Sequence, residues 1–472
     1  MQFFYKTSIY LCLIPLYFSN CKKLITIPPP VGSITTSQVF SSDNQAQSAM
    51  TGIYYNMINN QNFSRYGMSI FGGMSADELL IFNKTQTPYV QFQENDLTSS
   101  NAIVSGNFWA NPFSALYGAN SVIEGLSTSA GVHDSVKNEL IGEAEFVRAF
   151  SNFYLVYLFG DIPLITTINW HKTNLLSRTS VSEISQTIIS DLKDAQSRLP
   201  SDYSVGLSQR IIPNKWAATA LLARAYLYQQ QWDSAQIEAS LIINHSGLYR
   251  LTTGLDSVFL INSNEAIWQL QQDNVGGSTY NATPEGGQLI PVALNSHYPP
   301  FVYITNSLLT AFEPGDQRRI EWVDSTKYTG SQYYFPYKYK MGKGSASAGG
   351  AYTEYYMVLR LAEQYLIRAE AETKLGDLSD AAADLNIIRN RAGLPNTTAN
   401  IQADMLTAIA HERQVELFCE WGQRWLDLKR TGQATTILSL NKGFTVNSNA
   451  LLFPIPISEL IVDPNLTQNE GY

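Results

Sequence analysis

Two stretches of this 472-residue chain share one pattern: LLARAYLYQQQWDSAQIEASLII at 221–243 and LIRAEAETKLGDLSDAAADLNII at 366–388. In each stretch two alanines lie 12 residues apart, and a bulky side chain lies nine residues after the first alanine. These residues are Ala223, Trp232 and Ala235 in the first stretch, and Ala369, Leu378 and Ala381 in the second. Small residues where two helices cross, with a bulky residue at the turn, are typical of tetratricopeptide hairpins. The pattern therefore predicts two such hairpins.

Helical periodicity continues on the N-terminal side of these repeats. Apolar residues recur at spacings of three and four, as on one face of an α-helix, in four further segments. These segments are 43–60, 109–126, 136–159 and 180–199. The sequence thus predicts a mainly α-helical fold, a tetratricopeptide-like α-α superhelix with repeats over about 43–244 and again over about 356–432.

The region between these helical parts, about 245–355, has a different character. Short strand-like pieces such as 265–270 alternate with clusters of Gly, Pro and Asn, which predicts an irregular, loop-rich lobe carrying short strands. Residues 273–356 include 15 aromatic residues in 84, about 18%, against 12% for the whole chain. Because tyrosine combines a flat apolar face with a hydroxyl group, we expect this lobe to contact the ligand.

The N-terminus is typical of a bacterial lipoprotein. Lys6 precedes an apolar run over about 9–18, which is too short to span a bilayer and is followed by Cys21. We expect 1–20 to be a lipoprotein signal peptide and Cys21 to be acylated, with palmitate among the acyl chains. These chains would insert into the lipid of the outer membrane. Residues 21–42, which include three consecutive prolines, are then the anchor and tether. An unlipidated secreted form is the alternative.

Composition excludes several classes of function. The formal net charge of -9 disfavours nucleic acid, because a phosphate binder needs a dense basic surface. The three cysteines, Cys12, Cys21 and Cys419, supply no disulfide framework and no zinc site. The five histidines are scattered along the chain, so we expect no metal and no cofactor.

Five longer segments, in this order along the chain, carry a resemblance to a known family. They are FWANPFSALYGANSVIEGL (108–126), GEAEFVRAFSNFYLVYLFGDIPL (142–164), LRLAEQYLIRAEAETKLGDLSDAAADLNIIRNRAGL (359–394), ERQVELFCEWGQRWLDLKRTG (412–432) and LLFPIPISELIVDPNLTQNEGY (451–472). In these segments the chain resembles the SusD/RagB outer-membrane lipoproteins of Bacteroidetes. The resemblance implies one SusD-like domain over 43–472, in which four tetratricopeptide-like hairpins support the lobe at about 245–355.

The same resemblance implies a function and a place in the cell. Members of this family capture oligosaccharides or, in some cases, peptides, and act as a lid on a SusC-like TonB-dependent transporter. It therefore implies a protein that is lipid-anchored in the outer membrane and faces the exterior. Lys22 and Lys23 follow the cysteine where surface-exposed members often carry acidic residues, so the periplasmic leaflet stays an alternative.

Candidate ligand residues follow from the chemistry of sugars. A sugar presents C–H groups on its faces and hydroxyl groups on its edge, so recognition uses aromatic platforms flanked by polar side chains. The family pattern fixes no ligand residues, so we choose them from the aromatic loops and the nearby acidic segment. The candidates are Asp77, Tyr280, Tyr298, Trp322 and Tyr333. The alternative for each aromatic residue is core packing, and for Asp77 a loop cap.

The sequence gives little support to catalysis. Asp77 and Glu78 are the best acidic pair, but neighbours in sequence rarely flank one glycosidic bond. Glu412, Glu416 and Glu420 are spaced by four, which is more typical of salt bridges along a helix face than of a catalytic pair. We therefore expect a glycan-binding protein that is not an enzyme. Peptide capture, glycoside hydrolysis and a protein-binding scaffold are the alternatives.

Overall fold

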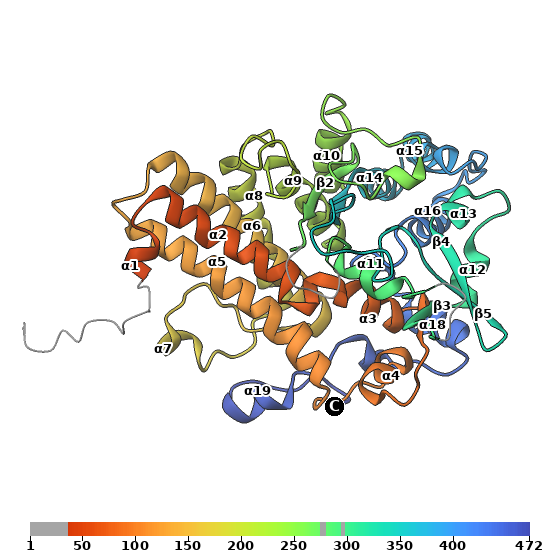
Figure 1. The fold of residues 1–472 in the computed structure, drawn as a ribbon, viewed down its shortest axis with the longest axis horizontal. Helices are drawn as coiled ribbons and strands as arrows, with labels where there is room; N and C mark the ends of the chain where they lie inside the picture. The colour runs from red at the N-terminus through yellow and green to blue at the C-terminus, as the bar shows by residue number, and fades with distance from the viewer. Residues whose placement is uncertain (1–35, 274–279, 294–297) are drawn as a thin grey trace, which may run out of the picture.

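The computed structural model describes residues 36–273, 280–293 and 298–472 (Figure 1). Helices form most of this part of the chain, which confirms the mainly α-helical prediction. No helix in the described ranges has both the length and the apolar composition needed to cross a membrane. Cys21 and the expected signal peptide lie outside the described residues.

The N-terminal half is a series of packed helices. Helices α2, α5, α6, α8, α9 and α10 each contact the next in this order. Their bounds, with those of the shorter segments between them, are α1 (Thr36–Val39), α2 (Asp43–Asn59), η1 (Phe63–Gly67), α3 (Met68–Ser75), α4 (Thr87–Glu94), η2 (Val104–Ala110), α5 (Asn111–Thr128), α6 (Asp134–Phe159), α7 (Trp170–Thr173), α8 (Val181–Arg198), α9 (Lys215–Tyr228) and α10 (Trp232–Ile243). The four periodic segments of the sequence correspond to α2, α5, α6 and α8.

The two predicted hairpins are confirmed as α9–α10 and as α14 (Leu361–Leu375) with α15 (Leu378–Arg391). All four of their spaced alanines are completely buried, as close helix crossings require. The turns also correspond, because Gln230 and Gly376 occupy the same offset and both adopt left-handed backbone, with φ of 56° and 98°. Glycine adopts this conformation without strain, so the second hairpin has the better turn residue.

Further helices complete the C-terminal half. Helix α10 packs on α14, which joins the two hairpins, and α14 packs on α16. The remaining helical segments are η3 (Leu255–Ser257), α11 (Pro284–Leu289), α12 (Asn306–Ala311), α13 (Gln317–Glu321), α16 (Gln402–Glu416), α17 (Gln423–Arg430), α18 (Ala434–Lys442), η4 (Ser448–Leu451) and α19 (Ile457–Val462).

The strands pair as three antiparallel two-stranded ribbons, β1–β3, β2–β6 and β4–β5. Strands β2 to β5 come from the lobe, whereas β1 comes from the N-terminal half and β6 directly follows the lobe. Their bounds are β1 (Leu79–Ile81), β2 (Ala266–Leu270), β3 (Val302–Ile304), β4 (Val323–Tyr328), β5 (Ser331–Pro336) and β6 (Tyr356–Arg360). Strand β2 confirms the strand expected at 265–270. In Figure 1 the strands β3, β4 and β5 lie at one end of the molecule, and α2 and α5 lie at the other.

The expected resumption of helix at Tyr356 is wrong by five residues. Residues Tyr356–Arg360 form β6, which pairs with β2 and is buried throughout, and α14 begins at Leu361. Because β6 is buried on both faces, it has no polar and apolar alternation. A continuous apolar run of this kind does not by itself distinguish a strand from a helix.

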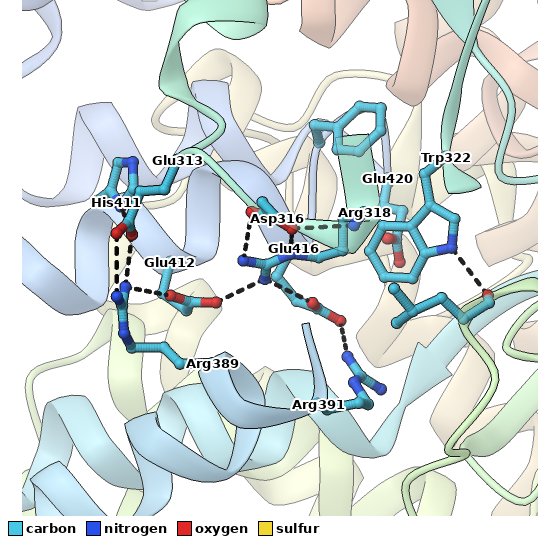
Figure 2. Close-up of polar contacts among 12 residues, drawn as sticks. Glu313, Asp316, Arg318, Trp322, Arg389, Arg391, His411, Glu412, Glu416 and Glu420 are labelled. Carbon is cyan, nitrogen blue, oxygen red and sulfur yellow. Dashed lines mark hydrogen bonds and ion pairs between the residues drawn. The ribbon is translucent and has the colours of Figure 1, made fainter. Parts of the chain in front are cut away.

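A buried ion-pair network connects the lobe to the end of α16. Arg318 donates to Glu416 at 2.9 Å and to Glu412 at 2.6 Å, and Arg391 pairs with Glu416 as well (Figure 2). Arg360 also donates to Glu416, at 2.6 Å. Burial would raise the pKa of Glu416, but the three arginines hold this pKa well below its usual range. The prediction that Glu412 and Glu416 form salt bridges is thus confirmed. The prediction that their partners lie along the same helix face is wrong, because the arginines come from other elements.

Candidate ligand-binding surface

The β1–β3 ribbon positions the candidate site, because strand geometry divides its side chains between two faces. Leu79 pairs with Ile304 and Ile81 with Val302, and all four of these side chains are buried. The central pair, Leu80 and Tyr303, therefore points to the opposite face, where both side chains are partly exposed. The ladder continues beyond the strand, since the Phe82 N–H donates to the carbonyl of Phe301 at 3.1 Å. Phe82 thus shares the outer face with Leu80.

Four partly exposed aromatic residues gather on this face, and we call Phe82, Tyr303, Tyr328 and Tyr333 the aromatic cluster. The Phe82 ring contacts Tyr328 and Tyr333 edge-to-face, each at 5.4 Å between centroids. Tyr303 contacts Tyr333 in the same way at 5.2 Å. Edge-to-face packing fixes the rings relative to one another, so the cluster is a preformed apolar surface.

A cavity of about 240 Å³ lies beside the aromatic cluster. Leu80, the strand partner of Tyr303, lines it and thereby connects the two features. We call this space the ribbon cavity. Its polar lining supplies amide and hydroxyl groups, namely those of Gln93, Thr305, Asn306, Ser307 and Asn441. Groups of this kind both donate and accept hydrogen bonds, as sugar hydroxyls do.

Asp77 borders the ribbon cavity, but its carboxylate is already occupied. Arg424 donates to its two oxygens at 2.9 and 3.0 Å, and Asn441 donates to Oδ2 at 2.6 Å. Burial would raise the pKa of Asp77, but Arg424 and Asn441 lower it below its usual value. The residue is 2% exposed. In this structure it anchors an ion pair, which corrects the expectation that it binds a ligand hydroxyl.

Glu78 also lies away from solvent. It is 1% exposed, and the backbone N–H of Cys419 donates to its carboxyl group at 3.3 Å. Burial, and then the charge of Asp77, raises the pKa of Glu78 to about 8. The Asp77–Glu78 pair therefore comprises one carboxylate held by arginine and one buried acid. Neither is presented to a glycosidic bond as an acid or a nucleophile would be.

Trp322 is a core residue, so its selection as a ligand platform is wrong. It has no exposed surface, and its indole N–H donates to the Leu255 carbonyl at 2.9 Å (Figure 2). Phe259 packs against its ring edge-to-face, and the Lys338 ammonium lies 4.9 Å from its ring centroid. Enrichment in aromatic residues does not reveal which rings face inward, and the Trp322 ring does.

The three tyrosine candidates lie at different places. Tyr333 is in β5 and belongs to the aromatic cluster. Tyr298 is 67% exposed and precedes β3. Tyr280 is partly buried and has a left-handed backbone with φ of 44°. Contact of these three residues with a ligand stays a prediction.

Sequence reasoning missed most of the surface. It did not select Phe82, Tyr303 or Tyr328, nor the amides of the ribbon cavity. Polar and apolar residues do not alternate in 79–82 (LLIF) or in 301–304 (FVYI), so the local pattern gave no signal that Phe82 and Tyr303 face outward. Their proximity depends on pairing between segments more than 200 residues apart, which one sequence does not show. Within the described residues, no group of three or more His, Cys, Asp or Glu side chains is placed to hold a metal ion.

Comparisons with known proteins give a consistent result. A family model described as "SusD family" matches residues 309–472, and another described as "Starch-binding associating with outer membrane" matches 35–227. SusD-like protein P25 of Formosa agariphila is 25% identical, with 98% of each chain covered. A SusD superfamily protein of Bacteroides vulgatus has a TM-score of 0.80 at 22% identity, covering 92% of this chain and 100% of the other. A laminarin binding SusD-like protein has a TM-score of 0.76 at 23% identity, with the same coverage.

Proposed function

We propose, from the premise that this chain belongs to the SusD family, that it binds an oligosaccharide on the aromatic cluster and the adjoining ribbon cavity. The observation that carries this proposal is the position of Tyr303. Its ring packs in the aromatic cluster, and its strand partner Leu80 lines the polar cavity. One ligand can therefore reach both an apolar platform and a set of amide and hydroxyl groups.

The chemistry of a glycan suits this arrangement. The C–H face of a sugar ring packs against aromatic rings, while hydroxyl groups on its edge need several donors and acceptors. At the cavity wall the Asn306 amide supplies both kinds of group, whereas Ser307 and Asn441, which donate to Asp77, supply mainly acceptors. Because the aromatic cluster and the ribbon cavity adjoin through Tyr303 and Leu80, we infer that more than one sugar unit contacts the protein.

Binding without turnover is the second part of the proposal. Asp77 is held by Arg424, and Glu78 is buried with a raised pKa, so the acidic pair suggested for a hydrolase is not presented to a bound sugar. SusD-like relatives support a binding role. Peptide capture is the alternative, because a peptide also offers apolar side chains and hydrogen-bonding groups.

The cellular role is proposed from the family and from the N-terminal sequence. We place the protein in the outer membrane, anchored through acylated Cys21 and facing the exterior. The description of the family model that matches 35–227 names association with the outer membrane, which supports this location. In this position the protein would deliver its oligosaccharide to a SusC-like TonB-dependent transporter.

A binding array of glycans and short peptides, probed with the full chain, tests the function. Laminarihexaose is the first glycan to titrate, because one structurally similar protein binds laminarin. We expect an oligosaccharide to bind without forming product. The double variant Phe82→Ala, Tyr333→Ala should lose this binding, whereas Tyr117→Ala, an exposed tyrosine of α5, should keep it. Binding confined to peptides, or equal binding by the double variant, would refute the proposal.

A further inference from the structure

A second cavity lies among the C-terminal helices. It has a volume of about 500 Å³ and is lined by α14, α16, α17, α18 and the loop before α18. We call it the helical cavity. Its walls include the apolar side chains of Leu406, Leu428 and Ile437. This size and lining are typical of a small-molecule site, in which apolar walls surround a few polar groups.

Two arginines at this cavity have unused hydrogen-bond donors. Arg413 donates through Nε and Nη2 to Asp427, at 2.6 and 3.1 Å, but its buried Nη1 has no partner in the described part of the chain. Arg424 donates through Nε and Nη2 to Asp77, and within the described ranges no hydrogen bond engages its Nη1; unlike Nη1 of Arg413, this atom is not buried, so it remains accessible to a ligand. Both residues are at least nine-tenths buried. A buried donor without an acceptor is unfavourable, so an acceptor in the cavity would be stabilising.

The charge of the lining also favours an anion. Four cationic side chains line the cavity, those of Lys374, Arg413, Arg424 and Arg430, against the acidic side chains of Glu370 and Asp427. Both acids are paired with arginine and Arg424 is paired with Asp77, so the surplus over these pairs is one positive charge, that of Lys374. Arg430 binds Glu370 with two hydrogen bonds, at 2.6 and 2.7 Å, and Asp427 accepts from both Arg413 and Arg430.

We propose that the helical cavity binds a monocarboxylate with a branched apolar body. The carboxylate would accept from Nη1 of Arg424 and, after a small shift of the lining, from Nη1 of Arg413. Arginine is suited to this role, since its planar group matches carboxylate geometry. The aliphatic body would pack against Leu406, Leu428 and Ile437. Such a carboxylate occurs in a free acid and at the C-terminus of a peptide.

Calorimetric titration of the full chain tests this site with matched acid and amide probes. N-acetyl-leucine represents a peptide C-terminus, 4-methylpentanoate represents a free acid, and the amide of each lacks the charge. We expect at least one acid to bind about tenfold or more tightly than its amide, because a charged acceptor strengthens the arginine hydrogen bonds. The acid that binds more tightly shows whether the cavity prefers a free acid or the C-terminus of a peptide.

A blocked cavity provides the control. Ala410→Trp places a large side chain at the cavity wall from an exposed position on α16, so the fold should persist and acid binding should disappear. Ala403→Trp, also exposed on α16 but outside the lining, should bind as the unmodified protein does. Equal affinity for acid and amide, no binding of either acid, or acid binding retained by Ala410→Trp would each overturn the proposal.

Discussion

Arg424 binds Asp77 with two hydrogen bonds of 2.9 and 3.0 Å, although the residues lie 347 positions apart in the chain. Asp77 lines the ribbon cavity and Arg424 lines the helical cavity, so this ion pair forms a boundary shared by the two cavities. It also joins α17 to the segment that leads into β1. The pair thus connects a C-terminal helix with the β1–β3 ribbon.

Breaking this pair should destabilise the protein. Asp77→Asn leaves the Arg424 guanidinium buried without its counter-charge, and we expect a loss of about 3 to 5 kcal/mol in the free energy of unfolding. Urea denaturation measures it. Because the penalty arises from the unpaired arginine, adding Arg424→Gln to Asp77→Asn should cost much less than the sum of the two single changes. Additive losses in the free energy of unfolding would show that the unpaired arginine does not cause the destabilisation.

Tyr333 and Trp322 should respond oppositely to truncation. Tyr333→Ala removes part of the aromatic cluster, so oligosaccharide affinity should fall roughly tenfold, about 1 kcal/mol or somewhat more, at a nearly unchanged melting temperature. Trp322→Ala empties a fully buried position and should lower the free energy of unfolding by about 3 to 5 kcal/mol. Affinity and melting temperature measured together distinguish them. A parallel fall of both in Tyr333→Ala would assign that ring to the core.

Local patterns predicted the scaffold, and long-range pairing determined the site. The alanine spacing identified both hairpins because a helix crossing depends on residues close in sequence, such as Ala369 and Ala381. The spacing of four between Glu412 and Glu416 did not predict their partners. Helix α16 ends at Glu416, and the arginines that bind this residue come from other elements. The spacing indicated a helix, but not the elements that pack on it.

The same limit applies to the aromatic residues. Enrichment in tyrosine located the lobe correctly as a place with exposed rings, and Tyr333 is one of them. Enrichment does not separate Trp322, which is buried, from Tyr333, because both occur in irregular sequence with weak periodicity. The contact of Phe82 with Tyr333 requires β1 and the β4–β5 ribbon to meet in space.

Anchoring should depend on Cys21. Cys21→Ala removes the acylated thiol, and we expect the protein to leave the membrane fraction while keeping its melting temperature, since the predicted tether precedes the helical core. Fractionation of washed outer membranes measures this. Cys419→Ala, at a buried position, should remain in the membrane fraction. Retention of the Cys21→Ala variant would contradict the lipoprotein assignment.

Overpacking a hairpin crossing should act on stability alone. Ala369 is completely buried in α14, so Ala369→Trp forces the α14–α15 crossing apart and should cost about 1 to 3 kcal/mol or more. Ala383→Trp, on the exposed side of α15, should be nearly neutral. Thermal unfolding compares them. Similar melting temperatures for the two variants would contradict the predicted crossing.

Stability should fall as pH rises between about 4.5 and 8, and Glu143 should contribute to this. Burial raises its pKa from 4.5 to about 8, although the Tyr54 hydroxyl, which donates to it at 2.7 Å, lowers the pKa. Over this range the folded state retains a proton that the unfolded state has lost, at about 1.4 kcal/mol per pH unit. Glu143→Gln should therefore become steadily more stable relative to the unmodified protein as pH rises, in urea denaturation at several pH values. Tyr54→Phe should extend to higher pH the interval over which stability falls, because Glu143 then loses the hydrogen bond that favours its charged form. A pH-independent difference between Glu143→Gln and the unmodified protein would refute the assignment.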